Sequence, residues 1–159
     1  MISEVQDKEE RRRIARCILE ALPEWFEIPE TRENYIEQSA DEIMLASLED
    51  GEANGFLCLK ETGKDTLELA VMGVLKEYHR QGIGRALFEA AREIAGERGY
   101  SFLQVKTVQM GRYPEYDDTN RFYLSLGFRE FEVFPTLWDE ANPCQVYVMA
   151  VRQRSGPEI

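Results

Sequence analysis

Apolar residues along the chain repeat with two different periods. In two segments they recur every three or four positions, which is the period of an amphipathic helix with one buried face. Pro23 and Gly99 follow these segments, as expected where helices end. Thr31 is a favourable capping residue and predicts a third, shorter helix. The predicted helices are 8–22, 31–39 and 82–98.

Between these helices, β-branched and aliphatic residues form shorter apolar runs, which predict strands. A polar turn at 62–65 separates two of them and predicts an antiparallel hairpin. Gly73 lies inside the second strand of this hairpin, where a glycine indicates a bulge or the close approach of backbone. The predicted strands are a weak one within 1–7, then 42–48, 55–60 after a turn at 49–54, 66–74, 101–108, 128–134 and 144–152.

This order of elements predicts one mixed α/β domain over residues 1–159. Strands 66–74 and 101–108 are joined through a helix, and the usual right-handed crossover makes such strands parallel. The hairpin of 55–60 and 66–74 is antiparallel, and strands 128–134 and 144–152 close the sheet as a C-terminal antiparallel pair. We therefore expect a single, mostly antiparallel sheet of six to seven strands with a central parallel pair and helices on both faces.

Residues 71–87 contain the most specific candidate chemistry. An apolar strand passes through a polar turn to Gly82 and Gly84 and then into a helix, so backbone N–H groups and the positive end of the helix dipole converge. A phosphate or pyrophosphate suits this point, although a tight turn without a ligand is the plainer interpretation. Arg85 follows Gly84 where a P-loop has Lys and then Ser or Thr, and the third small residue of the Rossmann fingerprint is missing, so both are excluded.

A second motif lies downstream, in residues 120–128, where Gly127 predicts the end of a short helix. Together, residues 79–84 and 120–128 resemble the signatures of the GNAT superfamily of N-acetyltransferases, Gln/Arg-x-x-Gly-x-Gly/Ala and Phe-Tyr-x-x-x-Gly-Phe. His79 stands where Gln or Arg is commoner. The resemblance covers roughly residues 43–152, and the first forty residues match only loosely.

The resemblance implies a GNAT-like fold and an N-acetyltransferase that transfers an acetyl group from acetyl-CoA to a primary amine in a ternary complex. Acetyl-CoA is then the co-substrate, no metal is required, and residues 1–40 lie on the acceptor side. The acceptor is a small cationic amine or an amino group of a peptide or protein. The residues that the resemblance assigns to CoA are Met72, Gly73, Val74, His79, Arg80, Gln81, Gly82, Ile83, Gly84, Arg85, Asn120 and Tyr123.

The resemblance also suggests two catalytic residues. Tyr123 is the expected acid for the leaving thiolate, and Glu68, six residues before Val74, is the expected base for the amine. An exposed strand carboxylate is the alternative interpretation of Glu68, in which case a water held by backbone carbonyls is the base. His79, the only histidine, is expected to face phosphate or solvent.

Aromatic and acidic residues gather in the segments that the resemblance places around the acceptor. Such a lining suits a cationic amine through cation–π and charge contacts, whereas each aromatic residue taken singly is also explained by core packing. The loop predicted at 113–118 is polar and contains a proline, so we do not expect all of its tyrosines to be core residues. The residues are Trp25, Phe26, Tyr35, Tyr113, Tyr116 and Trp138, with Glu24, Glu27, Asp117 and Asp118 nearby.

Composition limits the partners. The 159 residues are 43% hydrophobic and 31% charged, as in soluble globular proteins, and a net charge of −11 argues against nucleic acid. Within this acidic chain, Lys76, Arg80 and Arg85 surround the glycine turn and suit phosphate groups. No apolar run is long enough to span a membrane, and the first ten residues lack the apolar core of a signal peptide. We expect a cytoplasmic protein without a membrane partner; a homodimer is left open.

The three cysteines, Cys17, Cys58 and Cys144, are scattered among apolar residues and are expected to be buried thiols. Two other classes of function remain open. The same fold binding acyl-CoA without turnover would act as a sensor or partner module. A different nucleotide-binding α/β domain would bind ATP or NAD in competition with CoA.

Overall fold

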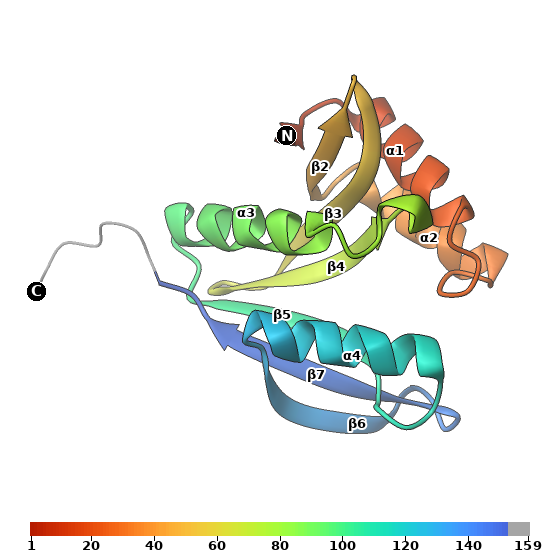
Figure 1. The fold of residues 1–159 in the computed structure, drawn as a ribbon. Helices are drawn as coiled ribbons and strands as arrows, with labels where there is room; N and C mark the ends of the chain where they lie inside the picture. The colour runs from red at the N-terminus through yellow and green to blue at the C-terminus, as the bar shows by residue number, and fades with distance from the viewer. Residues whose placement is uncertain (153–159) are drawn as a thin grey trace, which may run out of the picture. The chain divides into compact units, whose positions relative to one another are not determined.

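The computed structural model describes residues 1–152, and its elements are drawn in Figure 1. The strands are β1 (Ile2–Val5), β2 (Ile43–Glu49), β3 (Glu52–Gly63), β4 (Thr66–Val74), β5 (Phe102–Val108), β6 (Arg129–Asp139) and β7 (Asn142–Ala150). The helices are α1 (Lys8–Glu20), α2 (Pro29–Ser39), the short 3-10 helix η1 (Lys76–Tyr78), α3 (Ile83–Glu97) and α4 (Pro114–Leu126). One mixed sheet has the strand order β1-β2-β3-β4-β5-β7-β6, with β4 and β5 parallel. The predicted fold class is confirmed.

The chain forms two compact units. Unit 1 contains residues 1–60 and 69–94, and unit 2 contains residues 61–68 and the described residues from 95 onward. Their boundaries fall inside β3, β4 and α3, so β4 contributes its first three residues to unit 2 and the remainder to unit 1.

In unit 1, α1 and α3 cover opposite faces of the strands. A Cβ atom added to Gly73 of β4 would lie 3.0 Å from the Ile18 side chain of α1, and one added to Gly55 of β3 would lie 3.1 Å from Ile83 of α3. Phe56, which follows Gly55 and points to the other face, lies on the same side as Gly73. The atoms closest to Gly73 are side-chain atoms and not the backbone that the sequence predicted, and it is the packing of α1 that favours the glycine.

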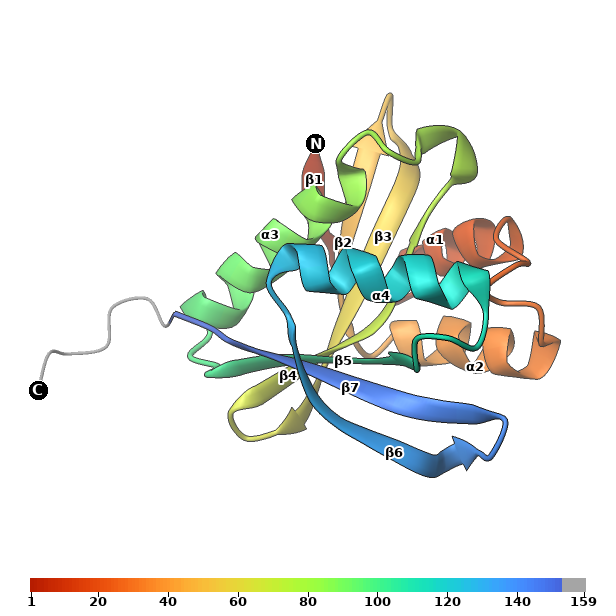
Figure 2. The same ribbon diagram turned by 60° about the horizontal axis from the view of Figure 1, so that its bottom comes forward.

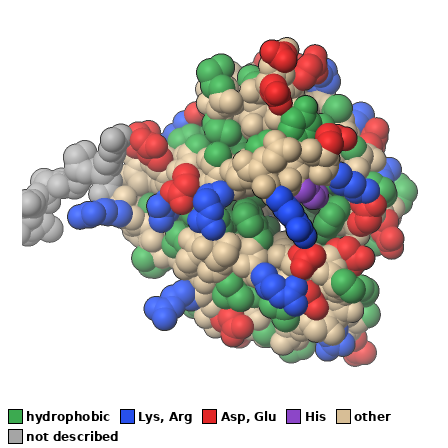
Figure 3. All heavy atoms as spheres, viewed as in Figure 1, with side chains coloured by type: hydrophobic (Ala, Val, Ile, Leu, Met, Phe, Trp, Pro, Cys, Tyr) green, Lys and Arg blue, Asp and Glu red, His purple; other side chains and the backbone are tan. Residues whose placement is uncertain are grey.

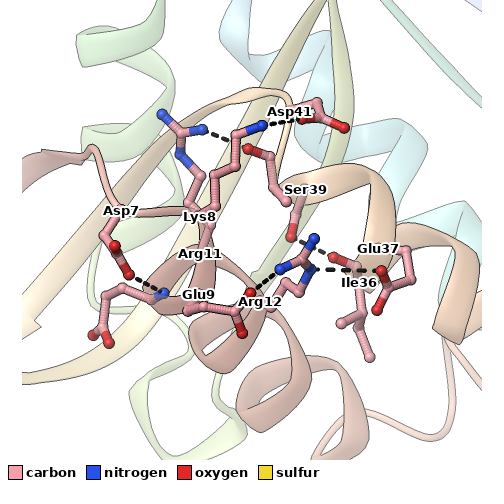
Figure 4. A network of polar contacts seen from close by, with 11 residues as sticks. Asp7, Lys8, Glu9, Arg11, Arg12, Ile36, Glu37, Ser39 and Asp41 are labelled. Carbon is pink, nitrogen blue, oxygen red and sulfur yellow. Dashed lines mark hydrogen bonds and ion pairs between the residues drawn. The ribbon is translucent and has the colours of Figure 1, made fainter.

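Helices α1 and α2 lie side by side in both ribbon views (Figures 1 and 2). Figure 4 shows the polar contacts around them: Arg12 of α1 pairs with Glu9 of the same helix and with Glu37 of α2, and Lys8 Nζ lies 2.9 Å from Oδ1 of Asp41, which follows α2. These exposed pairs add little stability each. The apolar side of α1 provides the larger contribution, because its four core residues are almost fully buried; they are Ile14, Ala15, Ile18 and Leu19.

In unit 2, α4 packs against β5, as both ribbon views show (Figures 1 and 2). It ends at Gly127, whose φ of 106° is the left-handed conformation predicted for this glycine. The N-terminal half of α4 corrects the prediction of a loop at 113–118. Pro114 begins the helix because its missing N–H and its fixed φ suit a first turn.

Three further predictions need correction. Helix α2 begins at Pro29, so Thr31 is not its cap. Strand β3 already begins at Glu52, inside the predicted turn. Cys17 is exposed, whereas Cys58 and Cys144 are buried as predicted, and burial raises the pKa of both of their thiols. Within residues 1–152 no helix is long and apolar enough to cross a membrane.

Candidate active site

The turn between β4 and α3 has the backbone conformation that an anion-binding loop needs. Arg80 and Gly82 adopt positive φ angles of 63° and 82°, and the first hydrogen bond of α3 runs from Ala86 N–H to Gly82 O at 3.0 Å. The N–H groups that precede Ala86 in the helix have no carbonyl one turn back. Gly82 is exposed, with nothing within 4 Å of a Cβ placed on it. An anion can therefore approach this backbone closely.

His79 fastens this loop to the end of β4. Its Nε2 lies 2.6 Å from Val74 O, and its ring meets Trp25 edge-on at 5.9 Å between centroids. Because a carbonyl oxygen can only accept, Nε2 carries the hydrogen in this contact. His79 is exposed and is the single purple side chain in Figure 3. It supports the loop from a position where Gln or Arg is commoner.

The basic residues around the loop are all exposed, but they differ in their contacts. Lys76 forms an ion pair with Glu24, and this hydrogen bond lowers the pKa of Glu24. Gln81 donates from Nε2 to Glu77 O at 3.1 Å, which holds its side chain along η1. Lys76 is thus already engaged by an acidic residue within unit 1, which the sequence gave no reason to expect.

The aromatic residues predicted near the acceptor are only partly buried in unit 1. Phe26 and Tyr35 meet edge-on at 5.9 Å between ring centroids, and both pack against the unit 1 core, as does Trp25. Core packing therefore accounts for part of each side chain. Met72 and Val74 of β4 are likewise half-buried, while Gly73 between them is buried.

Glu68, the predicted base, lies in the part of β4 that belongs to unit 2. It is 6% exposed, which overturns its interpretation as an exposed strand carboxylate. Its Oε1 lies 2.9 Å from Lys106 Nζ and 3.1 Å from Gln104 Nε2. A buried carboxylate needs such partners, because an unpaired charge in this position is costly. Gln104 Nε2 also donates to Thr62 Oγ1 at 3.1 Å.

Asn120 of α4 is the centre of a buried hydrogen-bond network in unit 2. Its Nδ2 donates to Val108 O at 2.9 Å and to Tyr116 O at 2.6 Å, and its Oδ1 accepts from the Tyr147 hydroxyl at 2.5 Å. Asn120 is fully buried, and Tyr147 is 1% exposed. Burial raises the pKa of Tyr147. Both amide hydrogens are donated within the protein, so Asn120 joins α4 to β5 and β7.

Tyr123, the predicted acid, lies one turn after Asn120 on α4. It is 9% exposed, and its ring packs against Phe128 and Tyr147 with centroids 5.9 and 6.3 Å away. Tyr147 of β7 therefore contacts both Asn120 and Tyr123. Sequence reasoning missed Tyr147, Lys106 and Gln104. The only signal for the last two was a pair of polar residues two apart in an apolar strand, which predicts a shared face.

Two of the three remaining predicted aromatic residues lie at the start of α4. Tyr113 is 38% exposed, and its ring meets that of Tyr116 edge-on at 5.9 Å between centroids. Asp117 accepts a hydrogen bond from Gly111 N–H at 2.7 Å and so stabilises the turn that precedes the helix. Trp138 is 46% exposed on β6. No group of three or more His, Cys, Asp or Glu side chains within residues 1–152 is arranged to hold a metal ion.

The predicted site residues thus belong to two sets, each assembled within its own unit. Unit 1 contains the glycine loop with His79, the C-terminal part of β4, and the aromatic residues 25, 26 and 35. Unit 2 contains Glu68, Asn120, Tyr123 and the two tyrosines at the start of α4.

Comparisons with known proteins agree with this reading of the motifs. The model of the acetyltransferase (GNAT) domain matches residues 39–130, which is more than half of the chain. No curated protein matches the chain. Among solved structures, a GNAT-family protein from Desulfovibrio desulfuricans is similar with a TM-score of 0.79 and 20% identity, covering 94% of this chain and 98% of that one.

Two further structures show the same fold. The ribosomal-protein-S18-alanine N-acetyltransferase from Escherichia coli has a TM-score of 0.74 and 18% identity, covering 100% of this chain and 99% of that one. An aminoglycoside 6'-N-acetyltransferase complexed with coenzyme A has a TM-score of 0.72 and 19% identity, covering 98% and 99%. At these identities the likeness establishes the fold.

Proposed function

Since the chain belongs to the GNAT acetyltransferase family, we propose that it transfers an acetyl group from acetyl-CoA to a primary amine by direct attack in a ternary complex. The observation that carries the proposal is the loop before α3, with positive φ at Arg80 and Gly82 and an open helix N-terminus. A structure of the same fold has coenzyme A bound, which supports CoA as the ligand class.

In this proposal the loop holds the CoA pyrophosphate. The N–H groups of Gly82, Ile83, Gly84 and Arg85 donate to the phosphate oxygens, and the α3 dipole favours their negative charge. Most of this recognition uses the backbone, so His79 is an acceptable replacement for Gln or Arg. The exposed side chains of Arg80 and Arg85 add attraction that salt screens.

The C-terminal part of β4 binds the pantetheine arm. We assign main-chain groups of Met72, Gly73 and Val74 to this contact, as a strand pairs with an extended ligand. A backbone N–H at this point also polarises the thioester carbonyl and stabilises the negative charge that develops on its oxygen.

Two side chains of unit 2 move the protons. An alkylammonium with a pKa of about 10 is not nucleophilic, so Glu68 accepts its proton, directly or through one water. The neutral amine nitrogen then forms a bond to the carbonyl carbon and releases its second proton to solvent, and the carbon–sulfur bond breaks. Tyr123 donates its hydroxyl proton to the departing thiolate and regains a proton from solvent. Asn120 acts through Tyr123 in this scheme, because its polar atoms hold α4 in place.

A cationic acceptor is favoured by charge and by aromatic residues. The net charge of −11 attracts cations from a distance. Trp25, Phe26 and Tyr35 of unit 1 and Tyr113 and Tyr116 of unit 2 keep exposed ring surface for cation–π contacts. We therefore place the acceptor among small cationic amines and the amino groups of peptides or proteins.

Two measurements test the proposal. Acetyl-CoA and CoA should raise the Tm of the protein, whereas ATP and NAD should not, because only the state with bound ligand is stabilised. A thiol-release assay with a panel of aminoglycosides, polyamines and short peptides should then detect turnover. Binding of CoA without turnover on any class of amine would favour a sensor. A shift with ATP or NAD in place of CoA would favour another nucleotide-binding domain.

A further inference from the structure

A cavity opens on the face of the unit 2 sheet that points away from α4. Tyr147 of β7 points towards α4, because its hydroxyl bonds Asn120 of that helix, and Val105 of β5 lies opposite Tyr147 in the ladder. Neighbouring residues of a strand point to opposite faces. Gln104 and Val148, which also oppose each other, therefore point away from α4, and both line the cavity.

The cavity has a volume of about 240 Å³ and is mostly apolar. Phe102 of β5, Phe131 of β6 and Val148 of β7 line it, and Thr66 of β4 and Gln104 of β5 supply its polar part. Phe102 is 44% exposed and Phe131 64%, so both rings keep surface for a ligand. An apolar cavity of about 150 Å³ is large enough to bind benzene. This one therefore has room for a single ring or a branched aliphatic group.

Phe131 owes its place in the lining to a bulge in β6. The ladder pairs Glu130 with Tyr147 and Glu132 with Val146. Since Tyr147 and Val146 are adjacent in β7, Phe131 is an extra residue without a partner in that ladder. A bulge of this kind turns a side chain in a new direction and is frequent beside functional sites. The bulge thus favours a ligand site over a chance hollow between strands.

The polar end of the cavity adjoins Glu68, the proposed base. Gln104 Nε2 lies 3.1 Å from Glu68 Oε1, so one side chain belongs to both places. Thr66 precedes Glu68 by two residues and shares its face of β4. Two residues along a strand span about 7 Å. An amine at Glu68 that is joined to a ring by a two-carbon chain therefore reaches the cavity.

We propose that this cavity holds an apolar substituent of the acceptor and so selects small amines that carry a single ring or a branched aliphatic group. The inference rests on the proposed function and narrows its acceptor class. The cationic head lies at Glu68, and the substituent leaves water to lie against Phe102 and Phe131. Polyamines and aminoglycosides place amino or hydroxyl groups where this substituent lies. They are expected to be poor acceptors, because an unpaired polar group in an apolar cavity is costly.

Two amines of similar basicity test the selection. 2-Cyclohexylethylamine and ethylamine are both primary alkylamines, and only the first carries a ring that fills the cavity. In the thiol-release assay, kcat/KM should be at least about tenfold higher for 2-cyclohexylethylamine, and spermidine should be no better than ethylamine. If ethylamine or spermidine is acetylated as efficiently as 2-cyclohexylethylamine, the selection is wrong while the proposed acetyl transfer stands.

Truncation of Phe131 tests whether the cavity is responsible for the preference. Phe131→Ser removes one wall at an exposed position, so the Tm should be retained. The ratio of kcat/KM between 2-cyclohexylethylamine and ethylamine should fall at least about fivefold. The matched control is Leu137→Ser, an apolar residue of the same strand that is 54% exposed and lies outside the cavity lining. This control should keep the wild-type ratio, and an unchanged ratio in Phe131→Ser would contradict the inference.

Binding without turnover separates this inference from the proposed function. CoA has no acetyl group to transfer, so calorimetric titration of 2-cyclohexylethylamine into the CoA-bound protein measures affinity alone. Phe131→Ser should raise the Kd at least about fivefold and Leu137→Ser should leave it unchanged. This result in a protein that acetylates no amine would support the cavity and count against acetyl transfer. A Kd that is the same in wild type and Phe131→Ser would overturn the inference whether or not turnover is seen.

Discussion

The loop before α3 and the segment of α4 that carries Tyr123 position their functional groups in opposite ways. The loop uses backbone: Gly82 is exposed, and Arg80 and Gly82 adopt positive φ angles just before the N-terminus of α3. The α4 segment uses side chains: Asn120 is fully buried, and Tyr147 of β7 contacts both Asn120 and Tyr123. A site made of backbone tolerates exchange of its side chains but not of its glycines. A site made of side chains depends on distant partners.

The largest effect is expected from breaking the backbone site. Gly84→Asp adds a carboxylate where the pyrophosphate is proposed to lie, so the Kd for CoA should rise at least about 100-fold. An acidic residue in the first turn suits the dipole of α3, so the Tm should be retained. Calorimetric titration measures the Kd for CoA of this variant and of a control, Gly63→Asp. The control adds the same charge at the exposed end of β3, where an added side chain meets open space. Unchanged affinity in Gly84→Asp would remove the loop from the proposed site.

The next effect concerns the side-chain site. Tyr123→Phe keeps the ring packed against Phe128 and Tyr147 and removes only the hydroxyl. If this hydroxyl protonates the leaving thiolate, kcat should fall about 100-fold while the KM for acetyl-CoA stays the same. Tyr100→Phe, which removes a hydroxyl that bonds exposed Glu61, is the matched control in steady-state kinetics. A wild-type kcat in Tyr123→Phe would mean that solvent supplies the proton.

Glu68→Gln has a smaller expected effect that depends on pH. Near neutral pH most of the amine is protonated, so removal of the base should slow turnover about tenfold, and the rate should recover partly at high pH as free amine becomes abundant. A pH–rate profile of this variant and of Glu61→Gln, an exposed carboxylate of the same unit, separates the two roles. A loss that does not vary with pH would assign Glu68 to its ion pair with Lys106 and leave a water as the base.

The smallest effect is expected on stability, in the hydrogen-bond network beside Tyr123. Tyr147→Phe removes the donor to buried Asn120 Oδ1 and should lower the free energy of unfolding by about 1–3 kcal/mol. Tyr100→Phe removes a hydroxyl that bonds exposed Glu61 at 2.7 Å, and should cost within about 0.5 kcal/mol. Urea denaturation compares the two variants. Equal losses would show that the Asn120 network contributes no more than a surface contact.

Local chemistry explains which elements the sequence could predict. The apolar period of α1 and α3, the hairpin between β3 and β4, and the glycine that ends α4 all depend on residues within one turn or one strand of each other. The predictions that failed depended on competing local signals or on how the segment packs in the tertiary structure. A proline at the first position, not a capping threonine, begins α2, and Cys17 is exposed although the apolar residues Ile18 and Leu19 follow it.

The candidate site divides in the same way. The sequence by itself determined the glycine loop, because φ angles and helix ends are properties of a few consecutive residues. Only the tertiary structure decided that Glu68 is buried against Gln104, 36 residues away, and that Asn120 receives its hydrogen bond from Tyr147, 27 residues away. The reason is physical: strand register and helix packing choose such partners by burying apolar surface, and one sequence pattern is compatible with many pairings until that burial is known.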